Sequence, residues 1–202
     1  MKRHKVIRTV FDYADDLALR VPTSCGRNGE CHECIVEIDT GSEALNSKTE
    51  SEEFLSEGFR LACQAKIVNP SVNFHFSVLK REPRVLSEGI KRSGIALNPM
   101  FSKFEDNVID VYGKVVDKYR GGILGIAADL GTTTVVLNLV NLETGDTIYT
   151  SSFENPQRFG GSDVMRRISY DGGTFKGELQ SVLVSALNFE IGEMVKAIGI
   201  RR

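Results

Sequence analysis

The stretch Cys25–Cys34, CGRNGECHEC, places three of the four cysteines of this chain within ten residues. The fourth, Cys63, follows after another 28 residues. Three thiols spaced C-x5-C-x2-C can share one inorganic centre if the loop wraps around it. Gly26 and Gly29 favour wrapping, because glycine accepts positive φ and lets backbone N–H groups approach anionic sulfur. If Cys63 belongs to the same centre, the elements around this loop must bring it there.

Composition places the chain among globular proteins. It has 202 residues, is 41% hydrophobic and 26% charged, and carries a net charge of −2. No apolar run approaches the ~18 residues that a membrane span needs, so we expect no membrane contact. Asp12, Asp15 and Asp16 stand where a secretory signal needs an uncharged stretch. We therefore expect a cytoplasmic protein, in which clustered cysteines more often bind metal or act in redox chemistry than form structural disulfides.

Three interpretations of the cysteines compete. A structural zinc site commonly pairs two C-x2-C knuckles, and this chain has only one. A [2Fe–2S] cluster suits three thiolates from one loop and a fourth from elsewhere, as this spacing provides. Unligated thiols are the third interpretation. The residues alone favour the cluster and leave zinc open.

Residues 30–57 are strongly acidic. They hold nine carboxylates against one cation, Lys48, which is a local charge of −8. Phosphates would be repelled, so this stretch argues against a nucleic-acid partner. It suits either a basic protein surface or, more commonly, a solvated face.

Hydrophobic spacing and turn residues predict the elements of the first 80 residues. These are a helix near 3–19, strands at Cys34–Ile38, Leu61–Val68 and Val72–Leu79, and a short helix near 50–57. Thr49 and Glu52 are typical of a capping box that starts the short helix. His32 is expected to face solvent, and His75 to be half exposed on its strand. Residues 81–122 are interpreted as a linker region with a helix near 107–119.

A second unit begins at Ile123. Its apolar runs predict three strands (from Ile123, Thr133 and Thr147) and two helices (from Val164 and Leu179). The turn DLGTTT lies between the first two strands, so Gly131 and the following N–H groups can form a nest for phosphate. A tight β-turn, with threonines chosen for strand propensity, explains the same residues equally well.

The cysteine loop, together with RLACQ around Cys63, resembles the adrenodoxin-type [2Fe–2S] ferredoxins, which share the five-residue first gap. The resemblance implies a β-grasp fold and an iron–sulfur ligand set of Cys25, Cys31, Cys34 and Cys63. A ferredoxin of this type begins with a two-strand hairpin. The 24 residues ahead of Cys25 read mostly as helix, so we expect an uncovered sheet edge where that hairpin would lie.

The DLGTTT turn resembles the first phosphate motif of the actin, sugar-kinase and heat-shock ATPase superfamily (the ASKHA ATPases). The resemblance implies that Asp129 holds Mg²⁺ through water. It further implies that ATP phosphates meet the turn residues Gly131, Thr132, Thr133 and Thr134. That fold also needs a second phosphate loop and an adenosine loop further along, so we expect an incomplete nucleotide cleft and no ATP hydrolysis.

The combination of a [2Fe–2S] domain, a linker and this motif resembles the reductive activators of corrinoid proteins. We therefore expect an α+β chain with a β-grasp ferredoxin-like domain at 1–80, a linker region at 81–122 and the first part of a ribonuclease-H-like ATPase domain at 123–202. The resemblance implies low-potential electron transfer from a donor protein to a corrinoid protein, driven by ATP. It also covers Asn155–Gln157 and Gly161–Val164, where Asp163 equally suits a helix N-cap. The competing expectations are a cluster-based redox sensor that binds through the acidic stretch, or an inactive truncated product.

Overall fold

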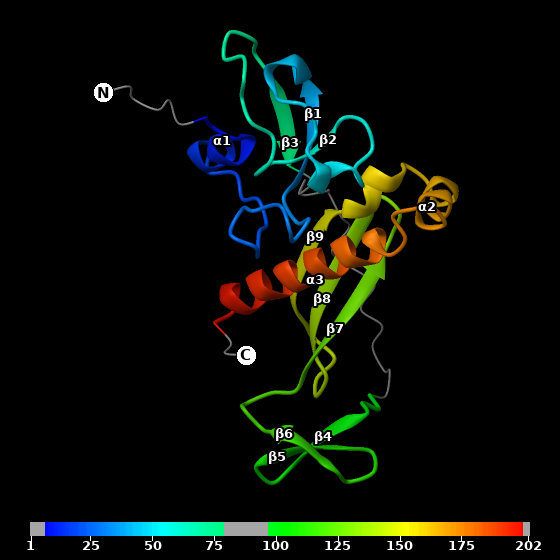
Figure 1. Ribbon diagram of the computed structural model, residues 1–202. Helices are drawn as coiled ribbons and strands as arrows, with labels where there is room; N and C mark the ends of the chain where they lie inside the picture. Colours follow the sequence, from blue (N-terminus) through cyan, green and yellow to red (C-terminus); the bar gives the residue numbers. More distant parts are fainter. Residues whose placement is uncertain (1–6, 79–96, 200–202) are drawn as a thin grey trace. The chain divides into compact units, whose positions relative to one another are not determined.

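The structure is a computed structural model that describes residues 7–78 and 97–199 (Figure 1). The chain forms two compact units. The first contains residues 1–81 together with 154–191, and the second contains residues 82–153 together with 192–202. In the described residues three small sheets lie between a first α-helix and two last ones, which confirms the predicted α+β class. None of the described helices is long and apolar enough to cross a membrane.

The sheet of the first unit is built around β1 (Ile35–Thr40). This strand pairs antiparallel with β2 (Phe59–Leu61) on one side and β3 (His75–Val78) on the other. The predicted first strand is confirmed, and the third is shorter than predicted. The strand predicted at Leu61–Val68 is wrong, because β2 ends at Leu61. The chain leaves the sheet after Leu61, where a turn closed by Gln64 N–H and the Leu61 carbonyl begins. Cys63 therefore lies in a turn and not on a strand.

Helix α1 (Val10–Asp16) is shorter than the helix predicted near 3–19, of which residues 1–6 lie outside the described part. Thr9 caps its start, because its hydroxyl accepts from Asp12 N–H while the Asp12 carboxylate accepts from Thr9 N–H. The helix ends before Ala18, whose φ of 54° breaks the helical path. Its first-turn donors Val10 and Phe11 bond to carbonyls next to Cys63.

The Thr49–Glu52 capping box is confirmed, but the helix that it starts is a single 3-10 turn, η2 (Glu50–Glu52). Another 3-10 turn, η1 (Ser42–Ala44), precedes it. The predicted continuation to residue 57 is wrong, because the Glu52 side chain turns inward instead of lying on an exposed helical face.

The first unit also contains η3 (Pro156–Gly160), α2 (Val164–Asp171) and the beginning of α3 (Glu178–Ala197). Phe159, Leu179 and Val182 are buried in the same apolar core as the strands around the cysteines. The core thus joins segments about a hundred residues apart in sequence. Both predicted helices are confirmed.

The second unit holds two sheets. The strands β7 (Leu124–Leu130), β8 (Thr134–Asn141) and β9 (Thr147–Glu154) form one of them in sequential order, as predicted. The other consists of β4 (Phe101–Phe104), β5 (Asn107–Asp110) and β6 (Val115–Lys118). The helix predicted near 107–119 is therefore wrong. Gly113, with a φ of 77°, and the Asp110 carboxylate, which accepts from two backbone N–H groups, form a hairpin turn there.

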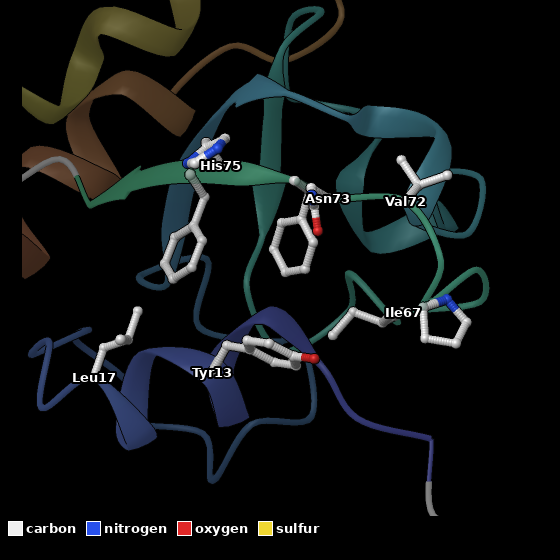
Figure 2. Close-up of a pocket in the computed structure, with 9 residues that line it drawn as sticks. Tyr13, Leu17, Ile67, Val72, Asn73 and His75 are labelled. Carbon is white, nitrogen blue, oxygen red and sulfur yellow. The ribbon is translucent and has the colours of Figure 1, made fainter.

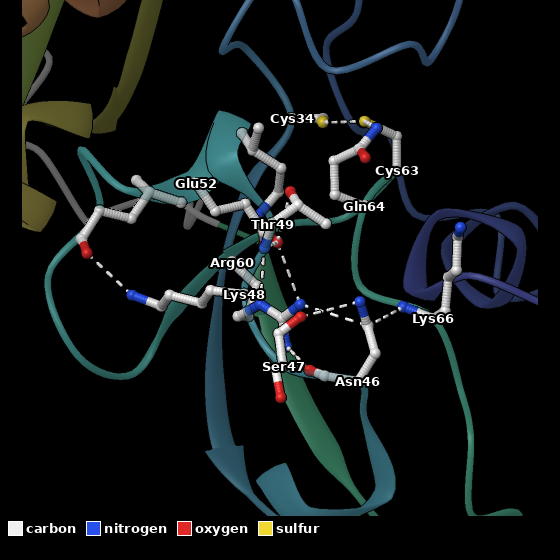
Figure 3. Close-up of polar contacts among 12 residues, drawn as sticks. Cys34, Asn46, Ser47, Lys48, Thr49, Glu52, Arg60, Cys63, Gln64 and Lys66 are labelled. Carbon is white, nitrogen blue, oxygen red and sulfur yellow. Dashed lines mark hydrogen bonds and ion pairs between the residues drawn. The ribbon is translucent and has the colours of Figure 1, made fainter.

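A buried ion pair lies beneath η2 (Figure 3). Glu52 is 0% exposed, and its carboxylate accepts from Arg60 Nε at 2.7 Å and from Leu61 N–H at 3.0 Å. Thr49 N–H donates at 2.9 Å to the other oxygen. One member of the acidic stretch is therefore internal, which corrects its interpretation as a wholly solvated face. Glu37 is a second exception, since it pairs with Arg158 at 2.8 Å.

The environment of Glu52 determines the direction in which its pKa is shifted. Burial alone would raise this pKa, because it disfavours the charged form. The hydrogen bonds from Arg60 and from the backbone outweigh burial and lower the pKa of Glu52 below its ordinary value. The stabilisation from this lowered pKa is therefore complete above the unfolded-state pKa of about 4.3 and is lost as the pH falls through the folded-state value.

We predict that Glu52→Gln lowers the free energy of unfolding at pH 7 by roughly 3–5 kcal/mol, because Arg60 then keeps a buried charge without its anion. Urea unfolding of the full chain measures the difference. The matched control is Glu53→Gln, an exposed neighbour that should change the value by less than about 0.5 kcal/mol. The gap between wild type and Glu52→Gln should narrow below about pH 4. Equal unfolding free energies at pH 7 would contradict the assignment.

Candidate metal centre

The four cysteines lie in two pairs. The Sγ atoms of Cys34 and Cys63 are 3.4 Å apart, and both residues are buried (Figure 3). Cys25 and Cys31 are half-buried, and the Thr23 hydroxyl lies 3.9 Å from each of their sulfurs. No set of three or more His, Cys, Asp or Glu side chains in the described residues is arranged to hold a single ion. Two thiol pairs suit a centre with two metal ions, each of which takes two thiolates.

The backbone of the cysteine loop is bent inward by several left-handed residues. The residues with positive φ are Gly26 (68°), Arg27 (72°), Gly29 (92°) and His32 (55°). Two of them are not glycine, which is uncommon and requires that other contacts hold the loop in place.

Inward-facing amides reach the sulfur of Cys25. The backbone N–H groups of Cys31, Asn28 and Glu30 act on the pKa of this thiol, and Glu30 N–H also donates at 3.1 Å to Asn28 Oδ1. Burial favours the neutral thiol, but the hydrogen bonds of these N–H groups and of the Cys31 side chain outweigh it and lower the pKa of Cys25 to about 6. The loop is therefore prepared to stabilise negative charge on sulfur, which a metal-bound thiolate requires.

In the second pair, Cys34 and Cys63, one thiol likewise has a lowered pKa. The hydrogen bond from Cys34 is the main cause that lowers the pKa of Cys63 to about 7, and Gln64 Nε2 adds a donor at 3.4 Å. The donor role correspondingly raises the pKa of Cys34. Each pair thus contains one sulfur that is readily deprotonated. The donor set and its amide lining fit a [2Fe–2S] cluster.

Three backbone hydrogen bonds place Cys63 beside the loop. Phe11 N–H of α1 donates to the Ala62 carbonyl at 3.0 Å, and Val10 N–H donates to the Ala65 carbonyl at 2.9 Å. Ala62 N–H donates to the Cys34 carbonyl at 2.8 Å. The turn that carries Cys63 is therefore fixed to α1 and to Cys34, the residue before β1.

Arg27 anchors the loop on the side of α1. Its guanidinium pairs with Asp15 at 2.7 Å and lies 3.8 Å from the centre of the Phe11 ring. Sequence reasoning missed this residue. The signal available was an arginine inside a glycine-containing loop, preceded by a helix with three aspartates.

His32 anchors the opposite side of the loop, so the prediction that it faces solvent is wrong. Its Nδ1 lies 3.0 Å from a carboxylate oxygen of Glu178, and its ring stacks on Phe54 at 4.2 Å. His75, by contrast, is exposed at the start of β3.

Away from the cysteines, a groove of about 260 Å³ separates α1 from β3 (Figure 2). Tyr13 and Leu17 line it from the helix, opposite Val72, Asn73 and His75. β3 is an edge strand of its three-stranded sheet.

The glycine–threonine turn joins β7 to β8. Gly131 N–H donates to the Thr134 carbonyl at 3.0 Å, and a Cβ at Gly131 would lie 2.6 Å from that oxygen, so the turn requires glycine. Asp129, Thr132 and Thr133 are exposed. Of the five predicted phosphate and magnesium residues, Asp129 lies near the end of β7, Thr134 starts β8, and the other three form the connection between these strands.

The segment after β9 uses its polar residues as caps. Asp163 accepts from Arg166 N–H at 3.0 Å, which confirms the N-cap interpretation. Asn155 accepts from Gln157 N–H at 2.9 Å and starts η3. Arg167 of α2 is buried, and its Nε donates to the Gly161 carbonyl.

Comparison with known families gives two matches. Residues 5–68 match the model of the 2Fe-2S iron-sulfur cluster binding domain, and residues 124–202 match the RACo middle region. The first match includes all four cysteines. The two matches confirm the resemblance recognised from the sequence.

Among solved structures, a chain described as "Reductive activator for corrinoid,iron-sulfur protein" is similar, with 19% identity and a TM-score of 0.47. The alignment covers 96% of the present chain and 42% of that chain, so the present chain spans less than half of its length. No curated protein matches.

Two loop glycines give a matched test of the site. A Cβ at Gly29 would lie 2.9 Å from Gln64 Nε2, whereas a Cβ at Gly26 would meet nothing within 4 Å, although both have positive φ. We predict that Gly29→Ala displaces the Gln64 donor from Cys63 and speeds the loss of iron to a chelator by roughly ten-fold. Gly26→Ala adds only backbone strain, so it should speed the loss of iron less than Gly29→Ala does. Equal rates of iron loss in the two variants would rule out this role of Gln64.

Proposed function

We propose that this chain is an electron carrier in which Cys25, Cys31, Cys34 and Cys63 ligate one [2Fe–2S] cluster. The observation that carries the proposal is the arrangement of the four thiols as two pairs beside an amide-lined loop. A bound cluster of this kind accepts and returns one electron. The match of residues 5–68 to a cluster-binding domain supports the proposal.

The surrounding residues define how such a centre works. The buried pair, Cys34 and Cys63, shields one side of the site from water, while Cys25 and Cys31 are half-buried. Electrons should therefore enter and leave on the side of Cys25 and Cys31, where a partner protein can approach. The N–H groups of the loop offset the negative charge on sulfur and so set the potential of the centre.

The proposed acceptor is a corrinoid protein, and the proposed donor is another electron-transfer protein. The match of residues 124–202 to the RACo middle region supports this extension, because the resembled family reactivates corrinoid cobalt by reduction. Plant-type [2Fe–2S] centres have potentials near −400 mV, so reduction of a still lower-potential cobalt centre needs coupling to ATP. We place the protein in the cytoplasm, where free thiols are maintained.

The turn at residues 129–134 is the proposed phosphate contact. Asp129 would hold Mg²⁺ through water, and the backbone of Gly131, Thr132, Thr133 and Thr134 would face phosphate oxygens. The support is the exposure of the Asp129, Thr132 and Thr133 side chains at the end of β7, together with the family match of this region.

The cluster proposal predicts two irons and two acid-labile sulfides per chain after anaerobic reconstitution, and a rhombic EPR signal after reduction by dithionite. Each Cys→Ser variant should lose the wild-type signal, because the four ligands are all the cysteines of the chain. The exposed serine variant Ser71→Ala serves as the control and should retain it. Stoichiometric zinc without sulfide would overturn the proposal.

The phosphate contact predicts that the chain binds Mg²⁺-ATP in equilibrium titrations, and that Asp129→Ala weakens binding by about ten-fold through loss of the metal-water contact. Asp146→Ala removes an exposed aspartate from the turn that follows β8 and should leave the affinity unchanged. Identical isotherms for wild type and Asp129→Ala would leave the turn as a purely structural feature.

A further inference from the structure

The cysteine loop contacts a segment that lies outside the matched cluster domain. Glu178, the first residue of α3, lies 3.0 Å from Nδ1 of His32, yet the cluster-domain match ends at residue 68. Arg158 makes a second connection by pairing with Glu37 of β1 at 2.8 Å. Residues 154–191 belong to the same compact unit as the loop.

Phe54 strengthens this connection. Its ring stacks on His32 with an angle of 19° between the planes, and Phe159 meets the same ring edge-on at 5.5 Å. The Phe54 carbonyl accepts a hydrogen bond from the Tyr170 hydroxyl. The imidazole is therefore held from one side by Glu178 and from another by a ring that residues 154–191 fix in place.

His32 occupies the position in the loop where such a clamp has most effect. Only His32 and Glu33 separate Cys31 from Cys34, and these two cysteines belong to different thiol pairs. His32 has a φ of 55°, an uncommon conformation for a residue other than glycine. A contact that fixes this backbone fixes the separation of the two thiol pairs.

We propose that His32 and Glu178 are positioning residues of the iron–sulfur centre, so that the beginning of α3 completes the domain that holds the cluster. The inference rests on the cluster proposed above. It makes the geometry of the centre dependent on the segment that follows β9, and a partner that displaces the beginning of α3 alters the centre.

The first test uses the full chain without iron. Iodoacetamide alkylation, followed by peptide mass spectrometry, gives the rates for Cys31 and Cys34 separately. Glu178→Ala should raise these rates several-fold, because the turn between them is released. Glu178→Gln should stay close to wild type, because its amide oxygen can still accept from Nδ1–H. Glu53→Ala removes an exposed carboxylate next to Phe54 and should have no effect.

The second test uses the reconstituted protein. Glu178→Ala should shift the midpoint potential and the EPR g-values of the reduced centre and speed iron loss by about ten-fold, with rescue by Glu178→Gln. If Glu178→Ala does not fold, His32→Phe keeps a ring on Phe54 while it removes the hydrogen bond, and it should give the same shifts.

The outcomes separate the two proposals. If Cys31 and Cys34 of Glu178→Ala are alkylated at the wild-type rates, the positioning role is overturned, whether or not iron binds. Lowered thermal stability with unchanged alkylation, potential and g-values also overturns it, because the contact is then merely structural. A wild-type chain that takes up no iron overturns the cluster, and the alkylation rates still decide the positioning role.

Discussion

The buried carboxylate of Glu52 is the constraint on which the first unit depends. It holds η2, through Thr49, to the end of β2, through Arg60 and Leu61. Two residues after Leu61 the chain reaches Cys63, so this ion pair sets the starting point of the turn that carries the fourth thiol. A carboxylate without exposure is tolerated only because its oxygens are paired and hydrogen-bonded. The position of Cys63 beside Cys34 thus follows from electrostatics several residues away.

The cysteine loop is held from outside itself. Arg27 ties one side to α1 through Asp15, and His32 ties the other to α3 through Glu178. These contacts explain how two residues that are not glycine keep positive φ in a short loop. They also explain why the compact unit includes residues 154–191, far from the loop in sequence. Electron transfer benefits from such a framework, because a centre held rigidly changes shape little when its charge changes.

The sequence predicted those features that depend only on residues close together in the chain. The Thr49–Glu52 capping box and the strands β7–β9 were predictable, because each depends on spacing over a few residues. The partners of Glu52 and His32 were not, since Arg60 and Glu178 are identified only by the tertiary fold. The helix predicted near 107–119 failed for another reason. The spacing of its apolar residues is compatible with a helix and with strands. The turn at Gly113 makes the segment a hairpin of two strands.

In the proposed centre all four sulfurs hold two irons, and no nitrogen takes part. X-ray absorption at the iron edge of the reconstituted protein distinguishes sulfur from nitrogen ligands. We expect a first shell of sulfur alone and an iron neighbour beyond it, because His32 is engaged by Glu178 and Phe54. A first shell containing nitrogen or oxygen, or the absence of an iron neighbour, would contradict this proposal.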